Sequence, residues 1–240
     1  MTQLITVGTG STGNAYILRD GDRQMLLDAG VYWKNIQKAS GYAPIDLAVA
    51  SHLHSDHVEA VKMVSRYACD VYAGEDAAQG IAERTGGKVR PLKPQKVHLL
   101  NGWKVLCFPL PHEDVPNYGF IVQSPESHHK LAYLTDFGYT QYRFRRIPVE
   151  TLLISCNHVD DTDRFKDAEN FQHVLRGHSS LSVVKEIIKT NMTDALKHII
   201  LCHMSEDNAD PEDMQREIQE MVGNEVSVDI AEKGKVIDLG

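Results

Sequence analysis

Four residues of metal-ligand type lie within six positions in the segment SHLHSDHVEA. His52 and His54 are two apart at the end of an apolar run, so their side chains would project to the same side of an extended chain and could bind one ion. Asp56 and His57 follow where the chain is expected to turn into a helix, and they could serve a second ion. Imidazole suits Zn, Fe and Mn ions, and a carboxylate beside it favours an open hydrolytic site over a closed structural one.

Three further residues of these types follow apolar runs with the pattern of strands. His112 ends WKVLCFPLPH, Asp136 follows KLAYLT, and His203 ends HIILCH. Active-site side chains of layered α/β proteins gather where strands run out into loops. Taken singly, either histidine could equally be a structural residue with satisfied hydrogen bonds. Together with the first cluster, the three complete a set of ligands for two ions.

Short strands and helices are expected to carry these residues. The first half has strand patterns at LITVG, NAYILRD, RQMLLDAG, IDLAVASH and CDVYAG, with helices over 58–67 and 75–84. The second half has strand patterns at KVHLL, WKVLCFPLPH, YGFIVQS, HKLAYLTDFG, TLLISCNH and HIILCHMS, with helices over 162–175 and 180–190. No Pro/Gly/Ser-rich linker separates the halves. We therefore expect a single α/β domain over residues 1–240, built as a four-layer αββα sandwich of two mixed sheets.

Composition limits the class of protein. The N-terminus lacks the features of a signal peptide, and no apolar window approaches the ~18 residues of a membrane span, so a cytoplasmic protein without a membrane partner is expected. The four cysteines form no CxxC pair and are expected to be reduced core thiols.

The charge distribution bears on nucleic-acid binding. The formal charge of -8 argues against a broad basic face, although bound divalent ions would add positive charge. The segment YRFRR (142–146) could lay its arginines along a nucleic-acid backbone with Tyr142 and Phe144 stacking on bases. Such a run is more often an ordinary solvated face.

The chain resembles the metallo-β-lactamase superfamily almost from end to end. The likeness rests on LLDAG with Asp28, SHLHSDH, PLPH, LTDFG and LCHMSEDN. Within the superfamily the chain is most similar to the YycJ/WalJ-like branch, on the strength of GTGSTGNAYIL, PHEDVPNYGF, SCNH, RGHSS and LCHMSEDNAD.

The resemblance implies a role for each residue. One metal ion would be held by three histidines, namely His52, His54 and His112. The other would be held by an aspartate and two histidines, namely Asp56, His57 and His203. Asp136 would bridge both ions, and Asp28 would lie behind the ligands and orient one of them. The cofactors would be two divalent ions, Zn or Mn, with Fe as a further option. A hydroxide bridging them would attack the substrate, and Asp56 could accept its proton.

Three residues outside the ligand set are also candidates. His178 in RGHSS could protonate a leaving oxygen or hold a nonbridging phosphate oxygen, or it could instead cap the helix that starts at Ser180. His158 resembles a family position, and a structural role is equally open to it. The family resemblance also implies that GTGSTGN is a tight turn that carries Asn14 toward the site.

Two residue identities and one spacing narrow the expected reaction. His54 stands where redox di-iron members usually have Glu, and Asp136 stands where antibiotic-hydrolysing relatives often have Cys. Only 66 residues lie between Asp136 and His203, positions 137–202, which excludes a β-CASP-type inserted subdomain. We predict a phosphodiesterase of the nuclease type acting on DNA or RNA ends. A glyoxalase-II-like thioesterase or lactonase, and a noncatalytic metal-binding module for a partner protein, are the alternatives.

Overall fold

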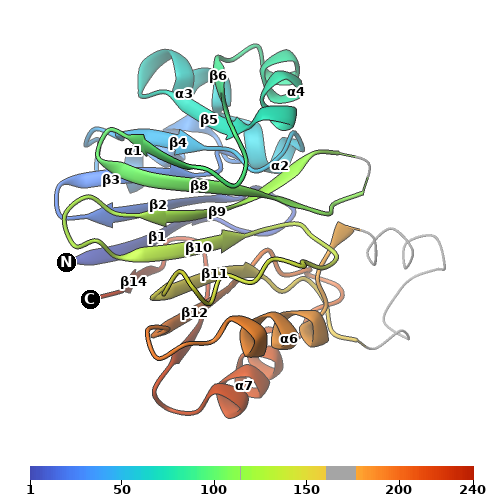
Figure 1. Ribbon diagram of the computed structural model, residues 1–240. Helices are drawn as coiled ribbons and strands as arrows, with labels where there is room; N and C mark the ends of the chain where they lie inside the picture. The colour runs from blue at the N-terminus through green and yellow to red at the C-terminus, as the bar shows by residue number, and fades with distance from the viewer. Residues whose placement is uncertain (114, 161–176) are drawn as a thin grey trace.

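Two seven-stranded sheets form the centre of the molecule, and helices lie outside them (Figure 1). The computed structural model describes residues 1–113, 115–160 and 177–240. In Figure 1, α3 and α4 lie beyond one sheet and α6 and α7 beyond the other. This arrangement confirms the expected αββα sandwich. Among the described residues, no helix combines the length and apolar character needed to cross a membrane.

The first sheet joins the N-terminal strands to the last strand of the chain. Its order is β14-β1-β2-β3-β4-β5-β6. Strands β14 to β3 in this order pair antiparallel, and β3 to β6 pair parallel. The bounds are β1 (Thr2–Gly8), β2 (Ala15–Asp20), β3 (Arg23–Leu27), β4 (Leu47–Val49), β5 (Val71–Gly74), β6 (Val89–Leu92) and β14 (Val236–Asp238).

The second sheet has the order β13-β12-β11-β10-β9-β8-β7. Strands β7 to β10 pair antiparallel, and β10 to β13 pair parallel. The bounds are β7 (Val97–Leu100), β8 (Trp103–Leu110), β9 (Asn117–Gln123), β10 (Lys130–Leu134), β11 (Thr151–Ser155), β12 (His198–Cys202) and β13 (Ser227–Ile230). The described helices are α1 (Trp33–Ala39), α2 (Ser55–Val58), α3 (Val61–Tyr67), α4 (Glu75–Thr85), α6 (Leu181–Asn191) and α7 (Pro211–Val222).

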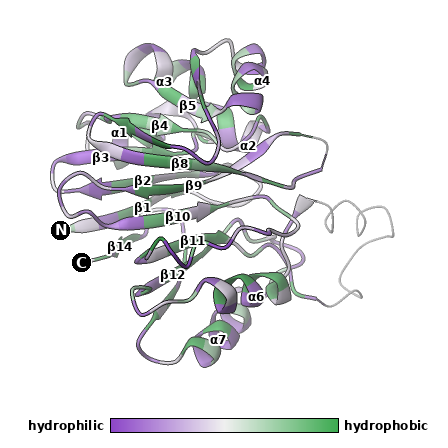
Figure 2. Cartoon of the chain, in the orientation of Figure 1, coloured by the Kyte–Doolittle hydropathy of each residue, from purple (hydrophilic) through white to green (hydrophobic). Residues whose placement is uncertain are grey.

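Strand β8 shows how the layers are held together. Its Trp103 and Val105 belong to the core that includes buried residues of both sheets. Its Phe108 and Leu110 belong to a second core, shared with buried residues of α6 and α7. Because alternate residues of a strand point to opposite faces, a strand covered on both sides is apolar on both. Figure 2 accordingly shows strands that are largely hydrophobic and helices that carry both kinds of residue.

Strand direction gathers the expected ligands at one edge. Strands β8 and β10 are both antiparallel to β9, so they run the same way, and β11 and β12 run parallel to β10. Their carboxyl ends therefore lie at a common edge of the second sheet. His112, Asp136 and His203 all follow such ends within two residues. In the first sheet, Asp28 and Ser51 follow the ends of the parallel strands β3 and β4.

The expected helix over 58–67 is wrong in its boundaries. The structure has two helices, α2 and α3, and Asp56 and His57 lie inside α2. The helix breaks because other loops bind its backbone groups: the Asp56 carbonyl accepts from Asn14 N (2.7 Å), and Ala60 N donates to the Ala29 carbonyl (2.7 Å). A helix cannot continue where its i to i+4 partners are taken.

Two of the other expected helices are confirmed. The helix over 75–84 is α4, which ends at Gly86 in the left-handed conformation. The helix over 180–190 is α6, whose N-cap Ser180 accepts a hydrogen bond from Val183 N. The helix expected over 162–175 lies outside the described residues.

Candidate metal centre

The structure brings together the seven residues expected as ligands. They form two groups, and within each group one nitrogen or carboxylate oxygen from every residue lies within 4.8 Å of those of the others. The groups are His52, His54, His112 and Asp136, and Asp56, His57, Asp136 and His203. Asp136 belongs to both groups, so its carboxylate joins them. Imidazole and carboxylate donors in two groups that share one residue fit a site for two divalent ions.

In the first group, the hydrogen bond to Gly177 fixes which nitrogen of His112 is free of a proton. His112 Nδ1 donates to the Gly177 carbonyl (2.8 Å), which leaves Nε2 as a bare acceptor 3.1 Å from His54 Nδ1. His52 Nε2 is buried and finds no hydrogen-bond partner among the described residues. An unpartnered buried nitrogen costs free energy, and a cation there would satisfy it. The first group therefore fits a metal ion.

The second group is closely spaced around two carboxylates. His57 Nε2 lies 3.3 Å from Asp56 Oδ2 and 3.2 Å from Asp136 Oδ2. His203 Nε2 lies 3.3 Å from Asp56 Oδ2, and its Nδ1 lies 3.2 Å from Asp136 Oδ1. Asp56 keeps 22% side-chain exposure, whereas His57 has none. Solvent therefore reaches this group at Asp56.

Asp28 lies directly behind both groups. It is fully buried, and its Oδ2 accepts hydrogen bonds from His57 Nδ1 (2.7 Å), Tyr133 Oη (2.6 Å) and Ser51 Oγ (2.9 Å). Since the single Ser51 hydroxyl proton goes to Asp28, the Ser51 oxygen must accept from His52 Nδ1, which lies 3.0 Å away. One carboxylate thus places the ring protons of His57 and His52 on Nδ1, and leaves an Nε2 lone pair in each group for an ion.

Asn14 lies beside the second group. Its Nδ2 is 3.2 Å from Asp56 Oδ2 and 3.2 Å from His57 Nε2, and its Oδ1 accepts from Gly10 N (3.0 Å). Glycine makes this approach possible, because a Cβ at Gly30 would overlap the Asp56 carbonyl oxygen. The turn at GTGSTGN therefore carries Asn14 to the edge of the candidate site.

Burial and neighbouring charges shift the pKa values of the buried ligands, and for Asp136 and His57 the two effects oppose each other. Burial lowers the pKa of His112 to about 4, so the ring is neutral near pH 7 and its lone pair is available. Burial alone would raise the pKa of Asp136, but the nearby His203 and His57 hold it well below its usual range. Burial would lower the pKa of His57, but Asp28 and Asp136 raise it well above its ordinary value. The carboxylates therefore attract a positive charge to His57, which a proton or a metal ion can supply.

His178 lies against the ligands and does not cap α6. Its Nδ1 is 3.5 Å from Asp136 Oδ1, and its ring stacks on His203 with centroids 5.6 Å apart. Burial would lower the pKa of His178, but the hydrogen bond and charge of Asp136 raise it. The capping interpretation is wrong, because the Ser180 side chain caps the helix.

His158 lies outside both ligand groups. It is buried, its Nδ1 donates to the Val159 carbonyl (2.8 Å), and its own carbonyl accepts from Leu181 N (2.9 Å). The second of these contacts ties the start of α6 to the segment that follows β11. The structure therefore gives His158 a supporting position.

The stacking role considered for Phe144 is wrong. Phe144 is only 5% exposed and belongs to the core beneath α6. Tyr142 packs on Phe108 with ring centroids 5.1 Å apart. Arg143, Arg145 and Arg146 are exposed. Of the side chains of YRFRR, only the arginines are exposed enough to contact a polyanion.

Sequence reasoning missed the residues that support the ligands. Ser51 and Tyr133 hold Asp28, and Gly177 holds His112. Asn117 Nδ2 donates to the carbonyl oxygens of Thr135 (3.0 Å) and Asp136. Ser51 stands within the histidine cluster and could have been suspected, but Tyr133 has the pattern of an ordinary core aromatic.

Sequence comparison finds a family and several relatives. The chain matches the beta-lactamase superfamily domain over residues 23–204. It is 26% identical over 223 residues to exodeoxyribonuclease WalJ of Streptococcus pneumoniae, covering 84% of this chain and 81% of that protein. It is 24% identical over 249 residues to exodeoxyribonuclease YycJ of Bacillus anthracis, covering 95% of this chain and 89% of that protein.

Solved structures share the fold. The metallo-beta-lactamase fold protein YhfI from Bacillus subtilis superposes with a TM-score of 0.75 at 19% identity, covering 98% of each chain. A diphosphatase from the PhnP family superposes with a TM-score of 0.70 at 17% identity, covering 99% of this chain and 98% of that one. At these identities the likeness is one of fold.

Proposed function

This chain belongs to the metallo-β-lactamase superfamily, and from that membership we propose that it is a dinuclear metal-dependent phosphodiesterase that degrades nucleic acid, DNA in particular, from its ends. The observation that carries the proposal is the sharing of Asp136 by two groups of ligand atoms. We assign His52, His54 and His112 to one ion and Asp56, His57 and His203 to the other, with Asp136 shared by both. Zn and Mn suit these donors, and Fe is a further option.

The chain's own residues supply the remaining chemistry. Two divalent ions, when bound, provide Lewis-acid activation of a phosphoryl oxygen and of water. Asp56 is a ligand that solvent reaches, and in the metal-free protein hydrogen bonds from His203 and His57 outweigh the effect of burial and hold its pKa below its usual range. Its ionised carboxylate can therefore orient water and accept a proton from it.

His178 is suited to act on the departing side of the phosphodiester. Its ring lies between His112 and His203, at 5.8 and 5.6 Å between centroids. The hydrogen bond and charge of Asp136 raise its pKa, a shift in the direction that suits a proton donor. We assign it to donate a proton to the leaving oxygen, or a hydrogen bond to a nonbridging phosphate oxygen.

The choice of substrate rests on two further considerations. Both curated relatives described above are named exodeoxyribonucleases, which supports DNA ahead of RNA. Asp136 stands where antibiotic-hydrolysing relatives often have Cys, which favours a phosphodiester over a lactam.

The test is degradation of end-labelled single- and double-stranded DNA and RNA by the metal-loaded protein. Asp56→Ala and His112→Ala should abolish cleavage, while His98→Ala, a control on β7 outside both groups, should cleave like the wild type. Metal content is measured for every preparation. A two-metal wild type that leaves all polymers intact but hydrolyses thioesters or lactones refutes the nuclease proposal. Full retention of cellular function by Asp56→Ala would favour a noncatalytic module.

A further inference from the structure

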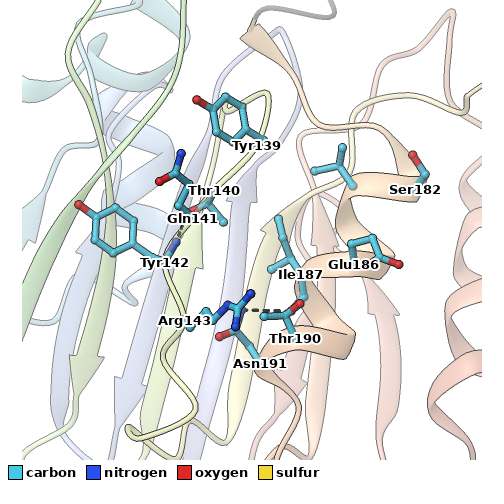
Figure 3. Close-up of a pocket in the computed structure, with 11 residues that line it drawn as sticks. Tyr139, Thr140, Gln141, Tyr142, Arg143, Ser182, Glu186, Ile187, Thr190 and Asn191 are labelled. Carbon is cyan, nitrogen blue, oxygen red and sulfur yellow. Dashed lines mark hydrogen bonds between the residues drawn. The ribbon is translucent and has the colours of Figure 1, made fainter.

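A groove lies between the segment 139–143 and helix α6 (Figure 3). Its volume is about 430 Å³, within the range of sites that hold small ligands. Figure 3 shows Tyr139 and Ser182 toward one end and Asn191 toward the other. The groove walls carry aromatic, hydroxyl, amide and guanidinium groups, which suits a polar ligand with flat apolar parts.

Both walls of the groove begin within a few residues of the candidate metal centre in the sequence. Tyr139 follows Asp136 by three residues, which limits their Cα separation to about 11 Å. Ser182 follows His178 by four residues, a limit of about 15 Å. Gly138 N also donates to the Pro111 carbonyl (3.2 Å), one residue before a proposed ligand. A chain leaving the metal centre can therefore enter the groove at its Tyr139 end.

Buried contacts hold the groove open at its far end. Asn191 is buried, its Oδ1 accepts from Phe144 N (2.8 Å), and its Nδ2 donates to the Ile187 carbonyl (3.1 Å). On the opposite wall, Tyr142 accepts a hydrogen bond from Gln95 Nε2 (2.8 Å). The side chains that would meet a ligand thus stand on a supported frame, which lowers the entropic cost of binding.

The exposed groups of the groove match a nucleic-acid strand. Tyr139 is 54% exposed and can offer a face to a base. Arg143 is exposed in the groove wall. Glu186 also lines the groove, but its charge is offset by Lys189, whose Nζ lies 3.5 Å away. Guanidinium groups bind phosphate, and aromatic rings stack on any base.

We propose that this groove binds a single strand of the nucleic-acid substrate as it leaves the metal centre, with Tyr139 stacking on a base and Arg143 contacting a phosphate. This inference rests on the proposed nuclease function. Because stacking and phosphate contacts read no base edges, recognition by the groove is tolerant of sequence. A base inside a duplex has both faces covered by its neighbours, so a base within the strand can stack against Tyr139 only when it has left the duplex, which suits a single strand.

The test compares two substrates of the same reaction type. The kcat/KM for a labelled single-stranded 12-mer DNA is divided by the kcat/KM for bis(p-nitrophenyl) phosphate, which is too small to span the metal centre and the groove. Tyr139→Ala should lower this ratio about tenfold, chiefly through KM of the 12-mer. Tyr139→Phe should keep the ratio, since it retains the ring. Tyr67→Ala, which removes an equally exposed tyrosine from α3, should also keep it.

Salt dependence tests the phosphate contact separately. Arg143→Ala should raise KM for the 12-mer and reduce the slope of log KM against log salt by about one. Arg84→Ala, an exposed arginine on α4, should leave the slope unchanged. If the wild type degrades the 12-mer and both groove variants match it within twofold at every salt concentration, the groove proposal is refuted and the nuclease proposal stands. If the wild type hydrolyses only the small diester, both proposals fall.

Discussion

Replacing Asp28 with Asn should weaken metal binding about 10- to 100-fold while leaving every proposed ligand in place. The Asp28 carboxylate accepts hydrogen bonds from Ser51 N, Ser51 Oγ, Tyr133 Oη and His57 Nδ1 at 2.6 to 2.9 Å. An amide of the same shape must turn its NH₂ group toward some of these donors. In the orientation that keeps the bond to Ser51 N, the NH₂ group faces His57 Nδ1. The His57 proton then moves to Nε2, or its Nδ1 proton loses its acceptor.

The size of the expected loss in metal affinity follows from which nitrogen of His57 is affected. His57 Nε2 faces Asp56 and Asp136 at 3.3 and 3.2 Å, and a ligating nitrogen cannot keep a proton. Loss of the partner behind a ligating histidine typically costs 10- to 100-fold in affinity, which is about 1.4 to 2.7 kcal/mol. Leaving a buried donor unpaired costs about 1 to 3 kcal/mol. The two estimates agree.

The assay is titration of the metal-free protein with Zn or Mn against a chelating competitor, with metal content measured at saturation. Tyr133→Phe is the matched control, because it removes one hydrogen bond to Asp28 but leaves the carboxylate that orients His57. Its metal affinity should change by less than about threefold, whereas its stability should fall by about 1.5 to 3 kcal/mol, the cost of a hydrogen bond to a charged group. If Asp28→Asn binds two equivalents of metal with wild-type affinity, Asp28 does not determine which ring nitrogens of His57 and His52 carry protons.

Three further predictions concern stability and the positioning of the site. Burial lowers the pKa of His129, so its contribution to stability is present above about pH 6.5 and is lost as the pH falls; His129→Gln should flatten acid unfolding curves. Gly30→Ala should lower the Tm by many degrees and reduce metal content, because a Cβ there overlaps the Asp56 carbonyl. Ser180→Ala removes the N-cap of α6 and should lower the free energy of unfolding, measured in urea, by about 1 kcal/mol. An unchanged urea midpoint would contradict a stabilising role for this cap.

The sequence predicted those parts of the fold that local pattern controls. Apolar runs and turn residues located most central strands, and the helices expected over 75–84 and 180–190 match α4 and α6 to within one residue at each end. The expected helix over 58–67 was wrong because residues far away in the chain, Asn14 and Ala29, bind its backbone groups. No local propensity records such long-range hydrogen bonds. The edge strands β6, β13 and β14 were missed, since they are short and half-exposed.

The sequence alone indicated the ligand residues of the candidate site, but not the hydrogen bonds that orient them. The spacing of His52, His54, Asp56 and His57 is dense enough to be noticed in one line of sequence. Their orientation depends on Asp28, which is more than twenty residues earlier and meets them only because β3 and β4 pair in parallel. The ligand assignment itself stays a prediction until metal content is measured.

Backbone conformation gives an independent reason to link these residues to function. Asp28, Asp136 and His203 have φ values of 56°, 44° and 50°, in the left-handed region that costs a residue with a side chain about 1 to 3 kcal/mol. Each lies within two residues of the end of a strand, where glycine would adopt the same turn without strain. Five other described residues with side chains also have positive φ and belong to neither ligand group, namely Tyr42, Gln95, Asn101, Glu113 and His128. At the three turns of the site, the side chain is one that meets at the centre or holds it. Asn117, by binding the carbonyl oxygens of Thr135 and Asp136, helps to maintain one such turn. Glycine would adopt these turns with less strain but could supply neither a carboxylate nor an imidazole, so the chemistry of the centre gives a reason for the side chains present there.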